Sequence, residues 1–350
     1  MSNRRLLTLT LLLLCYIAGP VWAGPFSALY VLGDSQSDSG NGALLTPDRA
    51  EPPYAPVPDA PYPNGRLTNG PVWAEYLAER LGKRAAPSRA GGTNYAVGTA
   101  AITGGTTPAI SLEAQAVELL ADLGGALPPD ALFAVWGGAN DTFQALDTND
   151  PTRITTAITA LDVILRGLVA AGARHFLVPN LGDAGLAPVF AEAGFGAAMT
   201  NLSRQFNTEL DLMLTSLMTD LPGIDLITLD VFALSQAIAF NPADFGLTNS
   251  ATPCLIFGPS LPPTQCTNPD EYLFWDALHF TTAAHRILGD VAYAAVPLPS
   301  PLVLLAPGLL LLLRRGARPS HANAAVTHGR PSGAATSGWV LTLRQPFVGI

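Results

Sequence analysis

Residues 28–41 have the sequence ALYVLGDSQSDSGN, in which an apolar run passes directly into a turn of small and polar residues. The run 28–32 has no polar face and is predicted to be a strand of a parallel sheet, buried on both sides. Ser35 follows on the turn, where neighbouring backbone N–H groups are free. A serine in this position is suited to act as an acylating nucleophile. The alternative role is that of a turn residue or helix cap.

Three further apolar runs have the length of buried strands, and they cover 131–136, 175–179 and 224–229. Helical patterns lie between and after the runs, near 71–81, 110–123, 152–171, 188–219 and 280–294. Strands that alternate with helices in this way indicate βαβ units and a parallel sheet with helices on both faces. In such a fold ligands bind at the carboxyl ends of the strands, which is where Ser35 is predicted to lie.

The charges separate a central domain from the two ends of the chain. The 350 residues carry a formal net charge of −9, and only 13% of them are charged. Residues 24–295 hold all 27 acidic side chains and 11 of the 18 basic ones, which gives this part a net charge of −16. A domain this acidic is a poor nucleic-acid binder, because such binders depend on Lys and Arg to neutralise phosphates. Its length fits one large α/β domain.

Residues 1–23 have the pattern of a secretory signal peptide. A basic start is followed by an apolar run and by small residues before Gly24. The apolar run is too short for a comfortable membrane span. An uncleaved anchor and a lipid-modified Cys15 are the alternatives, and the bulky Leu14 disfavours the second. Export and cleavage by signal peptidase are therefore predicted.

Residues 296–315 combine a Val-Pro-Leu-Pro motif, an apolar run and a basic pair. They resemble a PEP-CTERM sorting signal of the VPLP variant, which an exosortase processes at the inner membrane. The alternative is a last core helix of the domain, which Pro301 and Pro307 disfavour. Residues 316–350 contain no acid and many small residues, so a disordered tail is predicted. We expect a periplasmic, cell-surface or secreted protein that the C-terminal segment anchors transiently in the membrane.

An Asp and a His near the end of the central domain are spaced for acid–base catalysis. Asp276 and His279 lie three residues apart, so one turn can bring the carboxylate to one ring nitrogen while the other nitrogen faces a nucleophile. They are candidates for the orienting acid and the general base of Ser35. The other two histidines of this domain, His175 and His285, are interpreted as structural.

Two further segments offer hydrogen-bond donors for an oxyanion. Gly98 ends the segment 94–98, and its N–H can approach a ligand closely because a glycine has no side chain. Asn140 follows the predicted strand 131–136 directly and carries an amide. Two or three fixed donors at the oxyanion of an ester's tetrahedral intermediate lower the barrier by several kcal/mol. The alternatives are a tight turn at Gly98 and a helix cap at Asn140.

The central domain keeps two cysteines, Cys254 and Cys266, once Cys15 has left with the signal peptide. In an oxidising compartment the simplest prediction is a disulfide that closes the loop between them. No cluster of His and Cys at ligand spacing accompanies them, so no metal site is predicted.

Together these motifs resemble those of the GDSL-type SGNH hydrolases, a family of lipases and esterases. The resemblance extends over about residues 26–294 and rests on segments 33–41, 94–98, 138–141 and 276–279, and, for the lipase/esterase branch, 64–73. One departure is Gln36, where the family name has Leu. This position is adjacent to the nucleophile, so the expected effect is confined to local packing.

The resemblance implies a flavodoxin-like three-layer sandwich with a five-stranded parallel sheet. It also implies a catalytic triad of Ser35, His279 and Asp276. The implied oxyanion hole consists of the backbone N–H groups of Ser35 and Gly98 and the side chain of Asn140. The family implies no metal and no organic cofactor.

The sequence thus predicts an exported serine ester hydrolase that cleaves small-molecule or lipid carboxylic esters. An acetyl-polysaccharide esterase and a phospholipase are alternatives on the same fold, although a charge of −16 provides no attraction to anionic lipid. A catalytically silent surface-binding module is the alternative from another class. It is expected to have lost at least one motif, whereas all of them are present in this sequence.

Overall fold

The computed structural model describes residues 26–45, 61–104, 110–257 and 263–297, and all of these belong to one unit that ends at Leu298. The predicted signal peptide, the predicted tail and all but the first two residues of the predicted sorting signal lie outside the described residues. Within the described ranges no helix is long and apolar enough to cross a membrane.

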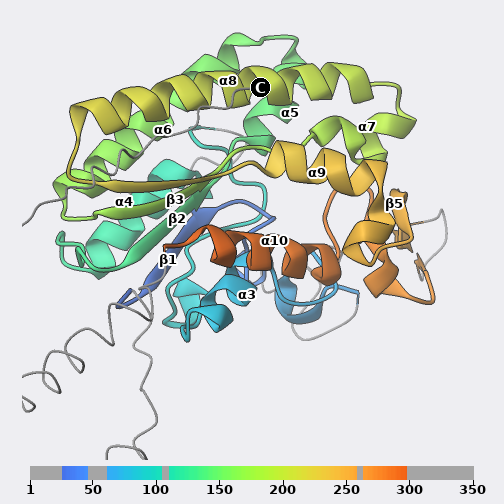
Figure 1. Cartoon of the computed structure of the whole chain (residues 1–350), viewed down its shortest axis with the longest axis horizontal. Coiled ribbons are helices and arrows are strands. Elements are labelled where there is room, and N and C mark those ends of the chain that lie inside the picture. Colours follow the sequence, from blue (N-terminus) through green and yellow to red (C-terminus); the bar gives the residue numbers. More distant parts are fainter. Residues whose placement is uncertain (1–25, 46–60, 105–109, 258–262, 298–350) are drawn as a thin grey trace, which may run out of the picture. The chain divides into compact units, whose positions relative to one another are not determined.

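Four strands form one parallel sheet whose order follows the sequence, β1-β2-β3-β4 (Figure 1). They are β1 (Leu29–Gly33), β2 (Leu132–Trp136), β3 (His175–Pro179) and β4 (Asp225–Leu229). Gly33 pairs with Trp136, and Pro179 pairs with Leu229, so neighbouring strands end together. These are the four apolar runs predicted from the sequence, and the parallel α/β sheet is confirmed.

The expectation of a fifth strand in this sheet is wrong. At the outer edge of β1, Val31 donates its N–H to Thr93 O (3.1 Å) and accepts from Tyr95 N (2.7 Å), which makes an isolated bridge at Asn94. The Asn94 side chain then accepts from Ala96 N (2.9 Å). The segment still follows β1, since Val97 N donates to Gly33 O (3.2 Å), but the Gly33 N–H donates to Gln115 Oε1 (2.9 Å) and not to this segment, so the pairing stays a single bridge.

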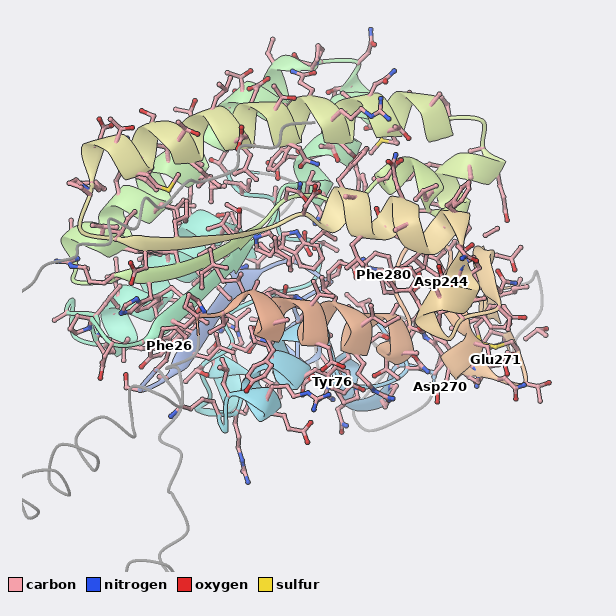
Figure 2. The ribbon with its side chains drawn as sticks, viewed as in Figure 1. Phe26, Tyr76, Asp244, Asp270, Glu271 and Phe280 are labelled. Carbon is pink, nitrogen blue, oxygen red and sulfur yellow. A yellow bond between two sulfur atoms is a disulfide. The ribbon has the colours of Figure 1, made fainter. Side chains whose placement is uncertain are left out.

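Helices cover both faces of the sheet, which makes three layers (Figure 1). Alternate strand residues pack on opposite faces: Phe133 and Phe176 belong to one core, and Leu132 and Leu177 to the other. Figure 2 shows side chains in the space between the sheet and the helices. The first core is completed by α4 (Leu112–Asp122), α5 (Ala139–Thr148), α6 (Thr152–Ala170) and α8 (Gly196–Asp220). The second is completed by α3 (Trp73–Arg80) and α10 (Thr282–Ala295).

One predicted helix, 188–219, is in fact two. α7 (Pro188–Glu192) is separated from α8 by Gly194, whose φ of +80° is a left-handed conformation that ends a helix. The structure also contains α2 (Asn41–Leu45) and α9 (Val231–Phe240). Short 3-10 helices lie at Pro63–Gly65, Ser88–Ala90, Ala184–Leu186, Pro242–Phe245 and Pro269–Glu271.

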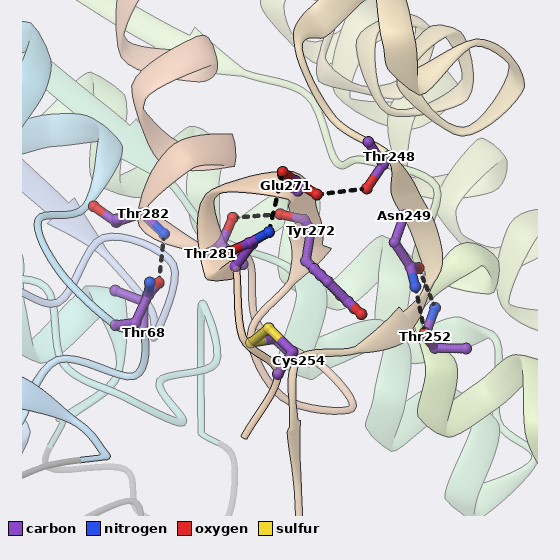
Figure 3. Close-up of a disulfide and its surroundings, with 12 residues drawn as sticks. Thr68, Thr248, Asn249, Thr252, Cys254, Glu271, Tyr272, Thr281 and Thr282 are labelled. Carbon is purple, nitrogen blue, oxygen red and sulfur yellow. Dashed lines mark hydrogen bonds between the residues drawn. A yellow bond between two sulfur atoms is a disulfide. The ribbon is translucent and has the colours of Figure 1, made fainter. Parts of the chain in front are cut away.

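Short strands occupy the insertion between α9 and α10. β5 (Asn249–Pro253) pairs in parallel with β8 (Tyr272–Phe274), and β6 (Leu255–Ile256) pairs antiparallel with β7 (Thr264–Gln265). A disulfide joins Cys254 to Cys266 in this insertion, as predicted (Figure 3). The insertion therefore lies directly before the segment that carries Asp276 and His279.

Candidate active site

Ser35 lies on the turn after β1, at the carboxyl edge of the sheet. Ser37 N donates to Asp34 O (3.0 Å) and Gln36 N donates to Asp34 Oδ1 (3.0 Å), so the turn closes around Ser35. Ser35 is half-buried. Its own N–H and hydroxyl have no hydrogen-bond partner among the described residues. Both groups are therefore available to a ligand.

Asp276 and His279 form a hydrogen-bonded pair. His279 Nδ1 lies 2.8 Å from Asp276 Oδ2 and 3.0 Å from Oδ1, and both side chains are largely buried. Oδ1 also accepts from the backbone N–H groups of Leu278 (2.8 Å) and His279 (2.7 Å). Burial alone raises the pKa of Asp276, but the charge of His279 and these hydrogen bonds outweigh it and hold the pKa below its ordinary value. Asp276 therefore remains an anion that orients the imidazole.

His279 belongs to the same site as Ser35. Its neighbours Leu278 and Phe280 line a groove that is also lined by Ser35 and Asn140. No hydrogen bond joins Ser35 to His279 in the described part of the chain. Such bonds are often long before substrate binds and tighten in the complex, so this geometry is compatible with a nucleophile and its base.

Asn140 lies in the first turn of α5 and lines the groove beside Ser35. Its Nδ2 donates one hydrogen to Ala100 O (2.8 Å), which fixes the amide, and the second hydrogen remains for a ligand. Gly98 behaves differently, because its N–H donates to Asp38 Oδ2 (2.8 Å) and is buried. Asp38 is a buried carboxyl group, and burial of such a group is costly unless it is hydrogen-bonded. It also accepts a hydrogen bond from Gly40 N (2.7 Å).

The next residue, Thr99, is exposed and has φ +69°. Ala100 N donates to Val97 O (3.2 Å) across it, so Thr99 occupies the third position of a turn that glycine normally occupies. A β-branched residue is strained in this conformation. The Thr99 N–H has no partner among the described residues. Sequence reasoning missed Thr99, since nothing in the pattern distinguishes the amide of Gly98 from the amide that follows it.

Two buried carboxyl groups adjoin these residues. Burial raises the pKa of Asp34 to about 6, although the N–H of Gln36 and the charge of His279 oppose the shift. Burial also raises the pKa of Asp141 to about 6, and Ile102 N (2.9 Å) donates to it. Both groups therefore titrate close to neutral pH.

The groove contains about 740 Å³ of empty space, part of it open to solvent. Its lining is mainly apolar and comes from the end of β2, from α5, from the loop after β3 and from β8. The apolar side chains include those of Trp136, Phe143, Leu181, Leu186, Leu273 and Phe274. Gln36 lines it as well, and its Oε1 is buried without a hydrogen-bond partner among the described residues. The departure at Gln36 therefore affects the groove and not only local packing.

Three hydrogen bonds tie the segment 61–73 to the segment 276–282. Thr282 N, at the start of α10, donates to Asn69 Oδ1 (2.8 Å), and Thr282 Oγ1 donates to Pro71 O (2.9 Å). Tyr62 donates its hydroxyl hydrogen to Asp276 Oδ2 (2.8 Å). The sequence motif explains the position of Asn69, whereas no pattern in the sequence predicts Tyr62.

The remaining predicted features are structural in the described part of the chain. His175 pairs with Asp225 over 2.8 Å at the sheet's other end, and His285 is buried with a pKa lowered to about 3 by burial. No three His, Cys, Asp or Glu side chains among the described residues are arranged to hold a metal ion.

A parallel α/β sheet with a serine and an amide in one groove and a His–Asp pair beside it is typical of hydrolases that act on esters. The family model of the GDSL-like Lipase/Acylhydrolases matches residues 29–292, and the chain belongs to this family. Membership places it among hydrolases of ester bonds.

Two similar proteins from a plant are GDSL esterase/lipases. GDSL esterase/lipase At1g71691 of Arabidopsis thaliana is 29% identical over an alignment of 322 residues, and the match covers 77% of this chain and 82% of that protein. GDSL esterase/lipase At5g22810 of the same plant is 26% identical over 75% of this chain and 87% of its own length. Among solved structures, a catalytic mutant of Axe2, an acetylxylan esterase from Geobacillus stearothermophilus, has a TM-score of 0.43 at 14% identity and covers 77% of this chain and 93% of its own.

Proposed function

We propose that the protein is an exported serine esterase that forms an acyl-enzyme on Ser35. The observation that carries this proposal is the Asp276–His279 hydrogen bond beside a groove lined by Ser35 and Asn140. With Nδ1 held by Asp276, the Nε2 of His279 is the ring nitrogen left to accept a proton.

The reaction proceeds in two halves. His279 Nε2 takes the Ser35 hydroxyl proton as Oγ attacks the ester carbonyl, and it then gives that proton to the leaving alcohol. The acyl group is left on Ser35. In the second half His279 takes a proton from water, the resulting hydroxide attacks the acyl carbonyl, and Ser35 recovers its proton as the carboxylic acid leaves.

The oxyanion of each tetrahedral intermediate is bound by the N–H of Ser35 and the second Nδ2 hydrogen of Asn140. The sequence suggested Gly98 N–H as a third donor, but this group already donates to Asp38. We assign the third position to Thr99 N–H, because it is exposed and unpartnered among the described residues. Asn140 supports this assignment, since it holds the carbonyl of the adjacent residue, Ala100.

The apolar lining of the groove supports an ester with an apolar acyl chain of several carbons rather than an acetyl group. Each buried methylene contributes about 0.8 kcal/mol, so kcat/KM is expected to rise about threefold to fourfold per carbon until the groove is filled. A p-nitrophenyl ester series from acetate to decanoate tests this. A maximum at acetate, together with turnover of an acetylated glycan, would favour an acetyl-polysaccharide esterase. Preference for phospholipid vesicles would favour a phospholipase.

The catalytic proposal is tested with Ser35→Ala. Hydrolysis of p-nitrophenyl butyrate is expected to fall at least 10³-fold, because no acyl-enzyme can form. Wild-type turnover by this variant would overturn the mechanism. Absence of turnover in the wild type on every ester would favour a catalytically silent binding module.

Export rests on the sequence of the two ends. Signal peptidase is proposed to cleave before Gly24, and an exosortase to process the segment 296–315. The mass of the intact mature protein tests both cleavages: a start at Gly24 and loss of residues beyond about 300 are expected. A full-length chain recovered from the cytoplasm would contradict export.

A further inference from the structure

The hydroxyl of Tyr62 is buried against the carboxylate of Asp276, and the mechanism above does not use it. The Tyr62 side chain is 2% exposed and its hydroxyl lies 2.8 Å from Asp276 Oδ2, from a point 214 residues earlier in the chain. Burial, the charge of Asp276 and this hydrogen bond all raise the pKa of Tyr62 far above its ordinary value. The hydroxyl therefore keeps its proton and can donate it to Asp276.

This donor completes the hydrogen bonding of Asp276. Oδ1 is held by the backbone N–H groups of Leu278 and His279, whereas the partners of Oδ2 among the described residues are His279 Nδ1, which also lies 3.0 Å from Oδ1, and Tyr62. Without Tyr62, the imidazole is the one partner of Oδ2 that remains among the described residues. The carboxylate then has one contact fewer to fix its rotation, and it exerts more of its negative charge on His279.

Tyr62 is itself held by the insertion that the disulfide closes. Its ring packs in a cluster with Cys254, Leu255 and Trp275, each no more than 2% exposed, and lies parallel to the ring of Phe257 at 6.5 Å. Figure 3 shows the disulfide beside Tyr272 and the start of α10. The insertion, Tyr62 and the catalytic segment thus share one small core.

Backbone hydrogen bonds join the same parts. Cys254 N donates to Phe274 O (3.0 Å), and Leu255 N donates to Trp275 O (2.6 Å). Trp275 N in turn donates to His279 O (2.7 Å). The residues next to the disulfide are therefore bonded to the strand that leads into Asp276.

We propose that Tyr62 is a positioning residue for Asp276, and that the disulfide-closed insertion keeps Tyr62 in place. The proposal rests on the proposed function, because it acts through the Asp276–His279 pair. Tyr62 touches neither substrate nor the reacting atoms. Its contribution is to fix the carboxylate and, through it, the imidazole.

The first test is Tyr62→Phe, which keeps the ring and removes the donor. A hydrogen bond to a charged group is worth about 1.5–3 kcal/mol, so kcat is expected to fall about 10-fold to 100-fold with KM within about twofold. The matched control is Tyr272→Phe, which removes a hydroxyl from the same cluster but does not touch Asp276. This control is expected to keep wild-type kcat.

The pH profile separates positioning from mere support of the fold. The charged and titratable groups that face His279 are Asp276, Asp34 from the turn after β1, and the uncharged His285 from α10. Loss of the Tyr62 donor leaves more negative charge at Oδ2, which stabilises the imidazolium. The acid limb of kcat/KM is therefore expected to move to higher pH in Tyr62→Phe and to stay in place in Tyr272→Phe. A Tyr62→Phe variant with wild-type kcat and an unshifted acid limb overturns the proposal, even if its melting temperature is lower.

The second test is a double-mutant cycle with Cys254→Ala/Cys266→Ala. If the disulfide acts through Tyr62, its removal lowers kcat severalfold in the wild type but less than twofold in Tyr62→Phe. Equal losses in both backgrounds contradict the proposed route. Should the double variant fail to fold, reduction of the folded wild type and Tyr62→Phe proteins with dithiothreitol supplies the same comparison. Failure of the proposed function is distinct, because it is seen as wild-type turnover in Ser35→Ala.

Discussion

Replacing Asn140 tests the oxyanion site without changing the nucleophile or the base. One Nδ2 hydrogen of Asn140 is donated to Ala100 O, and the other is assigned to the oxyanion. Loss of a single oxyanion donor lowers kcat about 10²-fold to 10³-fold, which corresponds to about 2.7–4 kcal/mol of transition-state stabilisation. Asn140→Ala is expected to show this loss in hydrolysis of p-nitrophenyl butyrate. KM should stay within about threefold, because the donor binds the charged intermediate far better than the neutral carbonyl.

Asn140→Asp sharpens the same test. The side chain keeps its shape, but an ionised carboxylate donates no hydrogen bond and places negative charge where the reaction develops negative charge. Its kcat is expected to fall at least as far as that of Asn140→Ala.

A measurement of the free energy of unfolding shows whether an Asn140 variant loses activity because it has lost its fold. Loss of the bond to Ala100 costs about 1 kcal/mol, which urea unfolding will detect but which leaves the protein folded at 25 °C. Asn249→Ala removes side-chain hydrogen bonds of the same kind in the insertion, outside the groove, and is expected to keep wild-type kcat. If both Asn140 variants retain kcat within threefold of the wild type, Asn140 does not bind the oxyanion.

Three further predictions concern stability. Because the pKa of Asp141 is raised from 3.8 to about 6, Asp141 stays protonated up to a higher pH in the folded protein than in the unfolded chain. The free energy of unfolding should therefore fall from pH 4 to pH 6 by about 2 kcal/mol more in the wild type than in Asp141→Asn; equal urea titrations would contradict this. Gly70→Ala places a Cβ 2.7 Å from Thr282 Oγ1 and is expected to lower the free energy of unfolding by about 1–3 kcal/mol, whereas an unchanged urea midpoint would refute the close packing. Gln36→Leu removes a buried, unpartnered amide oxygen and should raise the melting temperature by an amount equivalent to about 1 kcal/mol, and a lower melting temperature would show that the amide is satisfied.

The sheet was predictable because each of its strands is an apolar run with no alternative interpretation. Phe133 and Phe176 fill one face while Leu132 and Leu177 fill the other, so these positions of the inner strands had to be apolar. The edge strand β4 also carries the exposed Asp225 and Thr228. The fifth strand came from resemblance alone. It fails because the N–H of Gly33 donates to the side chain of Gln115 and not to the segment beside β1, and this contact joins positions 82 residues apart in the sequence.

Parts of the site followed from spacing, and other parts did not. Asp276 and His279 are local in sequence, so a single turn dictates their contact. The pairing of Gly98 N–H with Asp38 depends on two segments that meet only in three dimensions. The next residue, Thr99, has a left-handed backbone that its residue type does not favour. Tyr62 lies beside Asp276 because its position depends on the core around the disulfide. Spacing in the sequence predicts contacts between residues within one turn, but it does not predict contacts between segments that only the fold brings together.

The most direct test of the account is covalent labelling of Ser35. The folded protein is treated with a fluorophosphonate, and the adduct is located by peptide mass spectrometry. The account predicts one adduct, on Ser35, whose formation parallels the loss of esterase activity and which is absent from Ser35→Ala. Ester hydrolysis that persists without an adduct on Ser35, or an adduct on another residue that abolishes activity, would contradict it.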